Sequence, residues 1–212
     1  MPFDKNQDKI AITVSRFKLN RSSDGPLGTE HLCSNEPYLI TLAVDAHGIA
    51  QPILGFNSAS YPNVREGDEV KMLGHGHLVY GPGNPGSWVA ASVLLLESDG
   101  GVRRAGESLE AIIASAAKDA GLRTVLSSNP TALAVSSVLF SVGGLVARVL
   151  EANRDDQLLR TQGVFFRDEK VPFCVNRRLT RSNRMAEIDL DVIPLSSASG
   201  QGPTAQSLAL QA

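Results

Sequence analysis

A run of residues with almost no charge, from Thr131 to Leu150, constrains the fold of this chain more than any other feature. Arg148 is the only ionised residue in the run. At a rise of about 1.5 Å per residue, a helix of this length could cross a bilayer. Its serines and glycines dilute its apolar character, and small residues also suit close packing between helices. The sequence therefore leaves three placements open: a membrane, the face of a sheet, or the interior of an oligomer.

A second helical segment precedes this run. Apolar residues recur there at helical spacing, with Ser108 as a candidate cap and Gly121 as a candidate stop. These apolar residues are Leu109, Ile112, Ile113, Ala116, Ala117 and Ala120. Because Asn129-Pro130 separates the two segments, residues 103–153 are predicted to form a pair of helices.

The segments on both sides of the helices alternate between apolar and polar residues, as strands do. Residues 9–20 alternate with one slip, which predicts a strand with a bulge. Residues 87–101 are predicted to form a strand, and the unbroken apolar run 93–96 within it predicts that both faces are covered. Residues 81–87, with three glycines and two prolines, are expected to form a loop. Further strands are predicted within 38–48, 52–60, 69–81, 157–168, 171–180 and 185–195.

Neither half of the chain has enough strands to close a core alone. We therefore predict a mainly β (α+β) fold, a single antiparallel β-sandwich of about seven or eight strands over residues 1–195. The helical pair is inserted at about 103–153, which suits a chain of 212 residues. The tail, 196–212, is rich in Ser, Ala, Gln and Gly and is expected to be flexible or held by a partner.

Several short motifs follow one another along the chain. They are a first strand IAITVSRFKLNR, an acidic turn at Ser23-Asp24-Gly25, the segment SNEPYLITLAV, a strand ending in VLLLESDGG, a hairpin of small-residue helices and the segment NRDDQLLRTQGVFF. With these motifs, residues 9–195 resemble a group of uncharacterised bacterial C2-like β-sandwich proteins that carry a helical-hairpin insertion.

This resemblance implies a calcium site. In C2-like modules, acidic loops at one end of the sandwich often bind calcium together with membranes or partners, and a calcium ion takes about 6 to 8 oxygen ligands. Asn35 stands where the family often has Asp, and Ser98 separates Glu97 from Asp99. The alternative is that the carboxylates are solvated turn residues. The matching positions are Asp24, Glu36, Asp99, Asp155 and Asp156.

His75 and His77 form a second candidate metal site. A spacing of two residues predicts that both imidazoles lie on one face of a strand, where they could bind a transition metal. Further donors could come from His31, Cys33 or His47. The alternative is a plain surface strand, because no second metal-ligand motif accompanies the pair.

No catalytic signature is present. The chain has neither a G-x-S-x-G nucleophile motif nor a G-x-x-x-x-G-K-[ST] phosphate loop, and catalysis is therefore not expected. With 20 Lys and Arg against 22 Asp and Glu, nucleic-acid binding is not expected either. One basic cluster could contact phosphates, acidic lipids or an acidic partner, or could protect an edge strand from pairing. It consists of Arg177, Arg178, Arg181 and Arg184.

The first ten residues lack the apolar core of a secretory signal. We therefore expect a cytoplasmic protein, or one released without a Sec signal, including as part of a particle. Cys33 and Cys174 could form a disulfide or be two small buried hydrophobes.

Three functional hypotheses follow. The first is a non-catalytic interaction or structural module that self-associates or binds another protein, as a component of a larger bacterial or phage assembly. The second is a membrane-active protein that inserts residues 131–150, with calcium as a cofactor. The third is a metal-dependent enzyme of unknown reaction, centred on His75 and His77.

Overall fold

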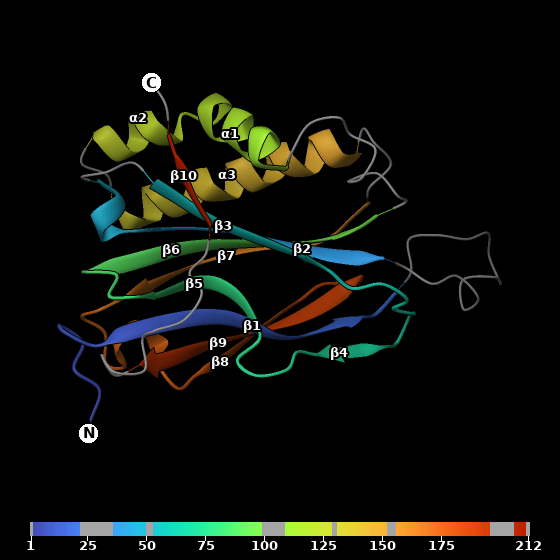
Figure 1. The fold of residues 1–212 in the computed structure, drawn as a ribbon, viewed down its shortest axis with the longest axis horizontal. Helices are drawn as coiled ribbons and strands as arrows, with labels where there is room; N and C mark the ends of the chain where they lie inside the picture. Colours follow the sequence, from blue (N-terminus) through green and yellow to red (C-terminus); the bar gives the residue numbers. More distant parts are fainter. Residues whose placement is uncertain are drawn as a thin grey trace.

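Three layers, one of helices and two of sheet, make up the protein (Figure 1). The structure is a computed structural model, and it describes residues 2–21, 36–49, 53–98, 109–128, 131–151, 156–195 and 206–210. In Figure 1 the helices lie above an upper sheet, and the upper sheet lies above a lower sheet. All strand pairs in both sheets are antiparallel.

The lower sheet is organised around β1 (Lys9–Leu19). Its order is β4-β1-β9-β8, and β5 also pairs with β1. The register between β1 and β9 shifts between Val14 and Arg16, so the predicted bulge is present. The other strands of this sheet are β4 (Glu69–Lys71), β5 (His77–Gly83), β8 (Arg178–Ser182) and β9 (Ala186–Leu195).

The upper sheet has the order β10-β3-β2-β6-β7. Two 3-10 turns, η2 (Ala46–Ile49) and η3 (Pro172–Cys174), follow β2 and β7 in the chain. The strands of this sheet are β2 (Pro37–Asp45), β3 (Ile53–Ser60), β6 (Trp88–Glu97), β7 (Asp156–Phe166) and β10 (Gln206–Ala209).

The helices lie between β6 and β7 in the chain, and these two strands pair directly. The predicted sandwich with a helical insertion is therefore confirmed. Among the described residues this insertion forms three helices rather than a pair: α1 (Leu109–Asp119), α2 (Leu122–Ser127) and α3 (Ala132–Glu151). Gly121, the predicted stop, has a φ of 68° and separates α1 from α2.

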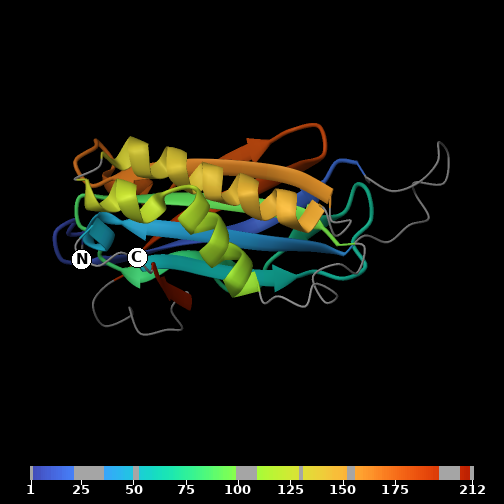
Figure 2. The ribbon, with the colours of Figure 1, turned by 90° about the horizontal axis from the view of Figure 1, so that it is seen from above.

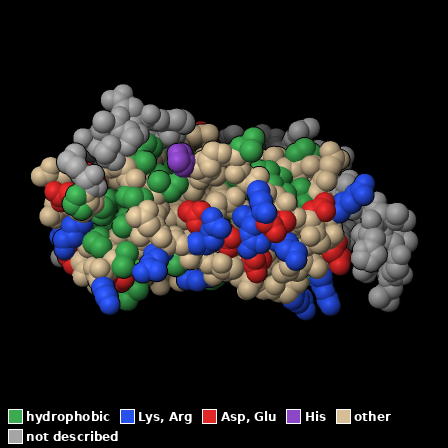
Figure 3. Space-filling view, turned by 90° about the horizontal axis from the view of Figure 1, so that it is seen from below, with side chains coloured by type: hydrophobic (Ala, Val, Ile, Leu, Met, Phe, Trp, Pro, Cys, Tyr) green, Lys and Arg blue, Asp and Glu red, His purple; other side chains and the backbone are tan. Residues whose placement is uncertain are grey.

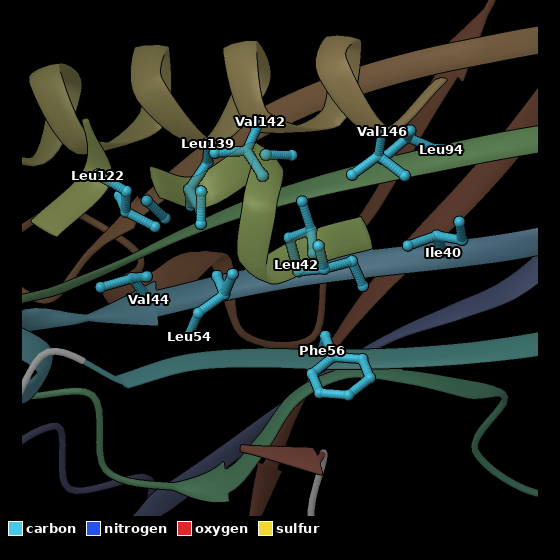
Figure 4. Close-up of a cluster of buried hydrophobic side chains, with 14 of the residues drawn as sticks. Ile40, Leu42, Val44, Leu54, Phe56, Leu94, Leu122, Leu139, Val142 and Val146 are labelled. Carbon is cyan, nitrogen blue, oxygen red and sulfur yellow. The ribbon is translucent and has the colours of Figure 1, made fainter. Parts of the chain in front are cut away.

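The upper sheet is buried on both faces, which explains why its central strands are apolar at consecutive positions. All ten residues of β6 are buried, because alternate side chains face the helices and the lower sheet. Figure 4 shows the helix side, where Leu139, Val142 and Val146 of α3 lie over Leu42 and Leu94. Each fully buried side chain of this size contributes about 1.5–3 kcal/mol. The predicted two-sided burial of 93–96 is confirmed.

Three strand predictions need correction. The segment 69–81 is two strands with a turn between them, and in the described residues the total is ten strands. Residues 81–83, expected in a loop, belong to β5, where Gly81 has a φ of 91°. A Cβ there would lie 2.3 Å from the Ile10 carbonyl oxygen, so only glycine lets the two backbones approach. In the tail, residues 206–209 form β10 against β3, and 196–205 lie outside the described residues.

Candidate functional site

The structure describes only two of the five carboxylates predicted to bind calcium. Asp24, Asp99 and Asp155 lie outside the described residues. Glu36 and Asp156 lie at one end of the upper sheet, because the register aligns Pro37 with Glu97 and Glu97 with Asp156. Among the described residues, no group of three His, Cys, Asp or Glu side chains could hold a metal. Calcium binding therefore stays a prediction.

The two histidines of the other candidate metal site do not share a strand face. His75 is exposed in the turn before β5, whereas His77 begins β5 and is 8% exposed. Gly76 separates them at a φ of 92°, so the backbone does not continue the strand alternation through the pair. Burial lowers the pKa of His77 from 6.5 to about 4, and its Nε2 has no hydrogen-bond partner within the described residues. The expected shared face is wrong, and transition-metal binding stays untested.

The structure does not describe two of the other predicted metal donors. His31 and Cys33 lie beyond the described residues, so a bridge from Cys33 to Cys174 stays a prediction. Cys174 is half-buried in η3, and burial raises the pKa of its thiol.

The arginine cluster lies on and around β8, which is an edge strand of the lower sheet. Arg178 donates two hydrogen bonds of 2.9 Å to Asp191 on β9. Arg181 is exposed and donates to the carbonyl of Thr180, while Arg177 and Arg184 are exposed outside the strand. The charged edge-strand alternative is the one that this geometry supports, because β8 presents charge at the end of the sheet.

Arg178 belongs to a charged network on the outer face of the lower sheet, where Figure 3 shows acidic and basic side chains intermixed. The register places Arg16 opposite Asp189, and Asp189 opposite Thr180. Arg16 donates a 2.7 Å hydrogen bond to Asp189 and a further one to Glu187. Thr180 donates to the other oxygen of Asp189 at 2.7 Å.

These contacts hold Asp189 ionised although its side chain is 4% exposed. Burial alone would raise its pKa, but the hydrogen bonds from Arg16 and Thr180 outweigh that effect and lower the pKa below 3.8. The same hydrogen bond to Asp189, with that to Glu187, raises the pKa of Arg16. The network is therefore a structural tie between β1, β9 and β8.

A hollow of about 400 Å³ adjoins this network. Three cations line its wall. Arg16 and Arg178 form ion pairs with the carboxylates of the network, and the Nζ of Lys71 lies 3.2 Å from a carboxylate oxygen of Glu69. The wall therefore neutralises most of its own charge, and it does not favour a ligand of one sign. The lining includes Ser15, Arg16, Lys71, Met72, His75, Arg178 and Asp191.

The outer face of α3 is the feature that stands apart from an ordinary protein surface. Figure 2 shows α3 lying along the upper sheet with α1 and α2 beside it. We use the term outer face for the exposed residues Leu133, Ala134, Ser137, Ser141, Arg148 and Val149. Leu133 is 66% exposed and Val149 is 43% exposed. Between Thr131 and Ala147 this face carries no charge.

Helix α1 provides the comparison. Its exposed positions include Glu110, Lys118 and Asp119, as expected for a helix that faces water. The two helices lie in the same layer and pack against each other. The absence of charge on α3 is therefore a property of that helix and not of the layer.

On its flank, α3 covers an arginine from the sheet. The guanidinium carbon of Arg160, on β7, lies 4.0 Å from the centroid of the Phe140 ring. A Cβ on Gly144 would lie 2.0 Å from Arg160 Nη1, so the glycine leaves the space that the guanidinium fills. Beside it, a Cβ on Gly143 would lie 3.1 Å from a methyl group of Leu94. The adjacent glycines thus let α3 approach the sheet closely.

Sequence reasoning missed Arg160. The signal that could have found it is the Gly143-Gly144 pair, since each glycine inside a helix costs about 1 kcal/mol relative to alanine. Such a pair indicates a close neighbour, but it does not say which residue approaches.

The last described segment forms a groove with the helices. β10 pairs with residues 53–56 at the edge of the upper sheet, and Arg123 of α2 donates a 3.0 Å hydrogen bond to the Leu210 carbonyl. A groove of about 550 Å³ lies between α1 and this segment, lined by both polar and apolar groups. Residues 206–210 of the tail thus lie against β3 and α2, and the expectation of a flexible or partner-held tail stays a prediction.

Comparison with known proteins adds no relative, since no family model, curated protein or solved structure matches this chain. The resemblance to C2-like sandwich proteins consequently stays a prediction beyond the confirmed sandwich architecture.

Proposed function

We propose that this protein is a non-catalytic structural module that associates with a second copy of itself through the outer face of α3. The observation that carries the proposal is the uncharged, partly apolar character of the part of that face that precedes Arg148. Exposed helix faces normally carry charged residues, as α1 does. An unbroken uncharged face favours contact with another apolar surface.

The choice of a second copy rests on charge and size. Two identical charged faces would place like charges against each other, whereas the segment from Leu133 to Ala147 has no charge to repel its own copy. Ala134, Ser137 and Ser141 are small, so the backbones of two α3 helices can approach closely. Such a contact closes at a dimer, and the dimer would enter a larger assembly through further contacts.

Sedimentation equilibrium of the full chain tests the proposal. We expect reversible association of the native chain, and at least about tenfold weaker association for Leu133→Lys and for Ser141→Lys, because each introduces a charge that a second copy would have to bury. Leu73→Lys is the matched control, since Leu73 is 95% exposed on the turn between β4 and β5.

Circular dichroism first confirms that all three variants are folded, which their exposed positions favour. A native chain that sediments as a monomer at every concentration at which it is soluble would overturn the proposal. Equal weakening by the Leu73 control would also overturn it, because the contact would then lie elsewhere.

Membrane insertion of α3 is the second candidate. It is favoured by the length of the helix and a mean hydropathy of 1.9, by which α3 is long and apolar enough to span a bilayer. In the structure, however, half of the most apolar 18-residue stretch of α3 is buried. If α3 left the sheet, Leu139, Val142 and Val146 would become exposed to water or lipid. Flotation of the full chain with neutral and anionic vesicles, with and without calcium, distinguishes the two: self-association predicts no bound protein, and insertion predicts bound protein.

A further inference from the structure

Two arginines converge on the same turn of α3, and none of the described residues places a carboxylate between them. Arg148 lies one turn beyond Gly144 and its Nε is 3.4 Å from the Gly144 carbonyl oxygen. The guanidinium of Arg160 occupies the space where a Cβ of the same glycine would be. Within the described residues, neither arginine has a carboxylate oxygen within 4.0 Å.

The surroundings satisfy this pair only in part. Phe140 offers its ring face to Arg160, and the last turn of α3 favours a cation through the helix dipole. The Nε of Arg160 is nevertheless buried with no hydrogen-bond partner in the described part of the chain. The pKa of Arg160 is lowered, mainly because the group is partly buried. The positive charge of Arg148 lowers this pKa further. The negative charge of Glu151 opposes this and raises the pKa of Arg160 by a smaller amount.

Buried donors and neighbouring like charges are costly unless an acceptor of opposite charge is supplied. Arg16, which is half-buried like Arg160, shows the usual solution, because it binds Asp189 and Glu187 directly. Arg148 is exposed, so its free donors can reach a ligand from solvent. At Arg148 and Arg160 the chain holds two guanidiniums together and supplies no such acceptor from the described residues.

We propose that Arg148 and Arg160 form an oxyanion-binding site on the flank of α3, which takes the carboxylate or phosphate group of a ligand. Guanidinium groups present paired N–H donors that match two oxygens of such a group. The Phe140 ring holds Arg160 in place, and Gly144 leaves room for its planar group. The site goes beyond the proposed self-association, because it requires a ligand and not a second copy.

Titration with inorganic phosphate and with succinate tests the site in two arms, one for each oxyanion. The ionic strength is held constant with chloride, and binding is followed by calorimetry and by the 15N NMR signals of the arginine Nε–H groups. We expect a saturable shift of the Arg160 signal in at least one arm. Saturation by phosphate alone would identify a phosphate site, and saturation by succinate a carboxylate site.

Three variants locate the binding. Arg160→Met and Arg148→Met should each weaken it at least about tenfold, since each removes a charged hydrogen-bond donor. Gly144→Ala should weaken it as well without removing any charge, because its Cβ displaces the Arg160 guanidinium. Arg181→Met is the control, since Arg181 is an exposed arginine on the other sheet and should leave binding unchanged.

Saturable binding that persists in Arg160→Met would overturn the proposal, as would a native chain whose Arg160 signal does not respond to either anion. Repeating the titration with Leu133→Lys separates this inference from the proposed function. That variant should lose self-association and keep the anion site.

Discussion

The guanidinium of Arg160 on β7 lies 4.0 Å from the centre of the Phe140 ring on α3, and Gly144 on the same helix leaves it room. This contact joins the helical layer to the sheet through a cation. It also explains Gly144, whereas the adjacent Gly143 leaves room for Leu94.

The glycine and the arginine should be energetically coupled. In the Arg160→Met background, Gly144→Ala should stabilise the protein by about 1 kcal/mol, because alanine is the better helix former. In the native background the gain should vanish, since the new Cβ displaces the guanidinium from Phe140 and loses about 1 kcal/mol of cation–π attraction. Urea unfolding of the four proteins of this double-mutant cycle measures the coupling. Equal stabilisation in both backgrounds would contradict it.

His77 should make stability fall as the pH is lowered from 6.5 to about 4. Its pKa is lower in the folded protein than in the unfolded chain, so the unfolded chain binds the proton first, and the stabilisation is complete only above 6.5. The difference in pKa corresponds to about 3 kcal/mol over this window.

Urea unfolding at several pH values tests this dependence. His77→Gln should flatten the dependence between pH 6.5 and 4, because glutamine does not titrate. His75→Gln should retain it, since His75 is exposed. A native chain whose stability is constant across this range would show that His77 is solvated when protonated.

Arg16 and Arg178 should differ in their contributions to stability. Arg16→Met leaves Asp189 buried without its main partner and should destabilise the protein by about 3 kcal/mol at pH 7. Arg178→Met removes an arginine whose side chain is 59% exposed and should cost no more than about 1 kcal/mol. Chemical denaturation of both variants measures the difference, and equal losses would contradict the assigned burial. In Arg16→Met, adding Asp189→Asn should recover part of the loss.

Gly81→Ala should be among the most disruptive small substitutions. The added Cβ would meet the Ile10 carbonyl oxygen at 2.3 Å, at a positive φ that disfavours other residues. We expect a loss of more than about 2 kcal/mol. Gly74→Ala isolates the effect of the clash, because Gly74 has a φ of 63° but no neighbour within 4 Å. It should cost only about 1 kcal/mol, the conformational part alone. Thermal unfolding of the two variants compares them.

The apolar periodicity of the sequence correctly predicted strands and helices that bury one face or both faces. The slip in residues 9–20 became the bulge of β1, the unbroken apolar run 93–96 became the two-sided strand β6, and Gly121 ended the first helix. These features depend on neighbours in the chain, so the local pattern is sufficient to find them.

The features that the sequence did not predict depend on residues far away in the chain. Residues 206–209 have little to bury alone and form a strand only because the edge of β3 offers hydrogen bonds. Residues 81–83 look like a loop, yet they extend β5 because β1 lies beside them. The side chains of His75 and His77 do not share a strand face, because the chain turns between them at Gly76.

Alternation and helical spacing are local properties of the chain, so they were sufficient to predict an antiparallel sandwich with helices inserted between two of its strands. The contacts of the charge-free run depend on how the layers pack: one side of α3 packs on the upper sheet, the other is exposed, and its flank covers Arg160. A local pattern records that a side chain must be buried or a glycine kept small, but the neighbour that requires it lies on another strand and is set by how the layers pack.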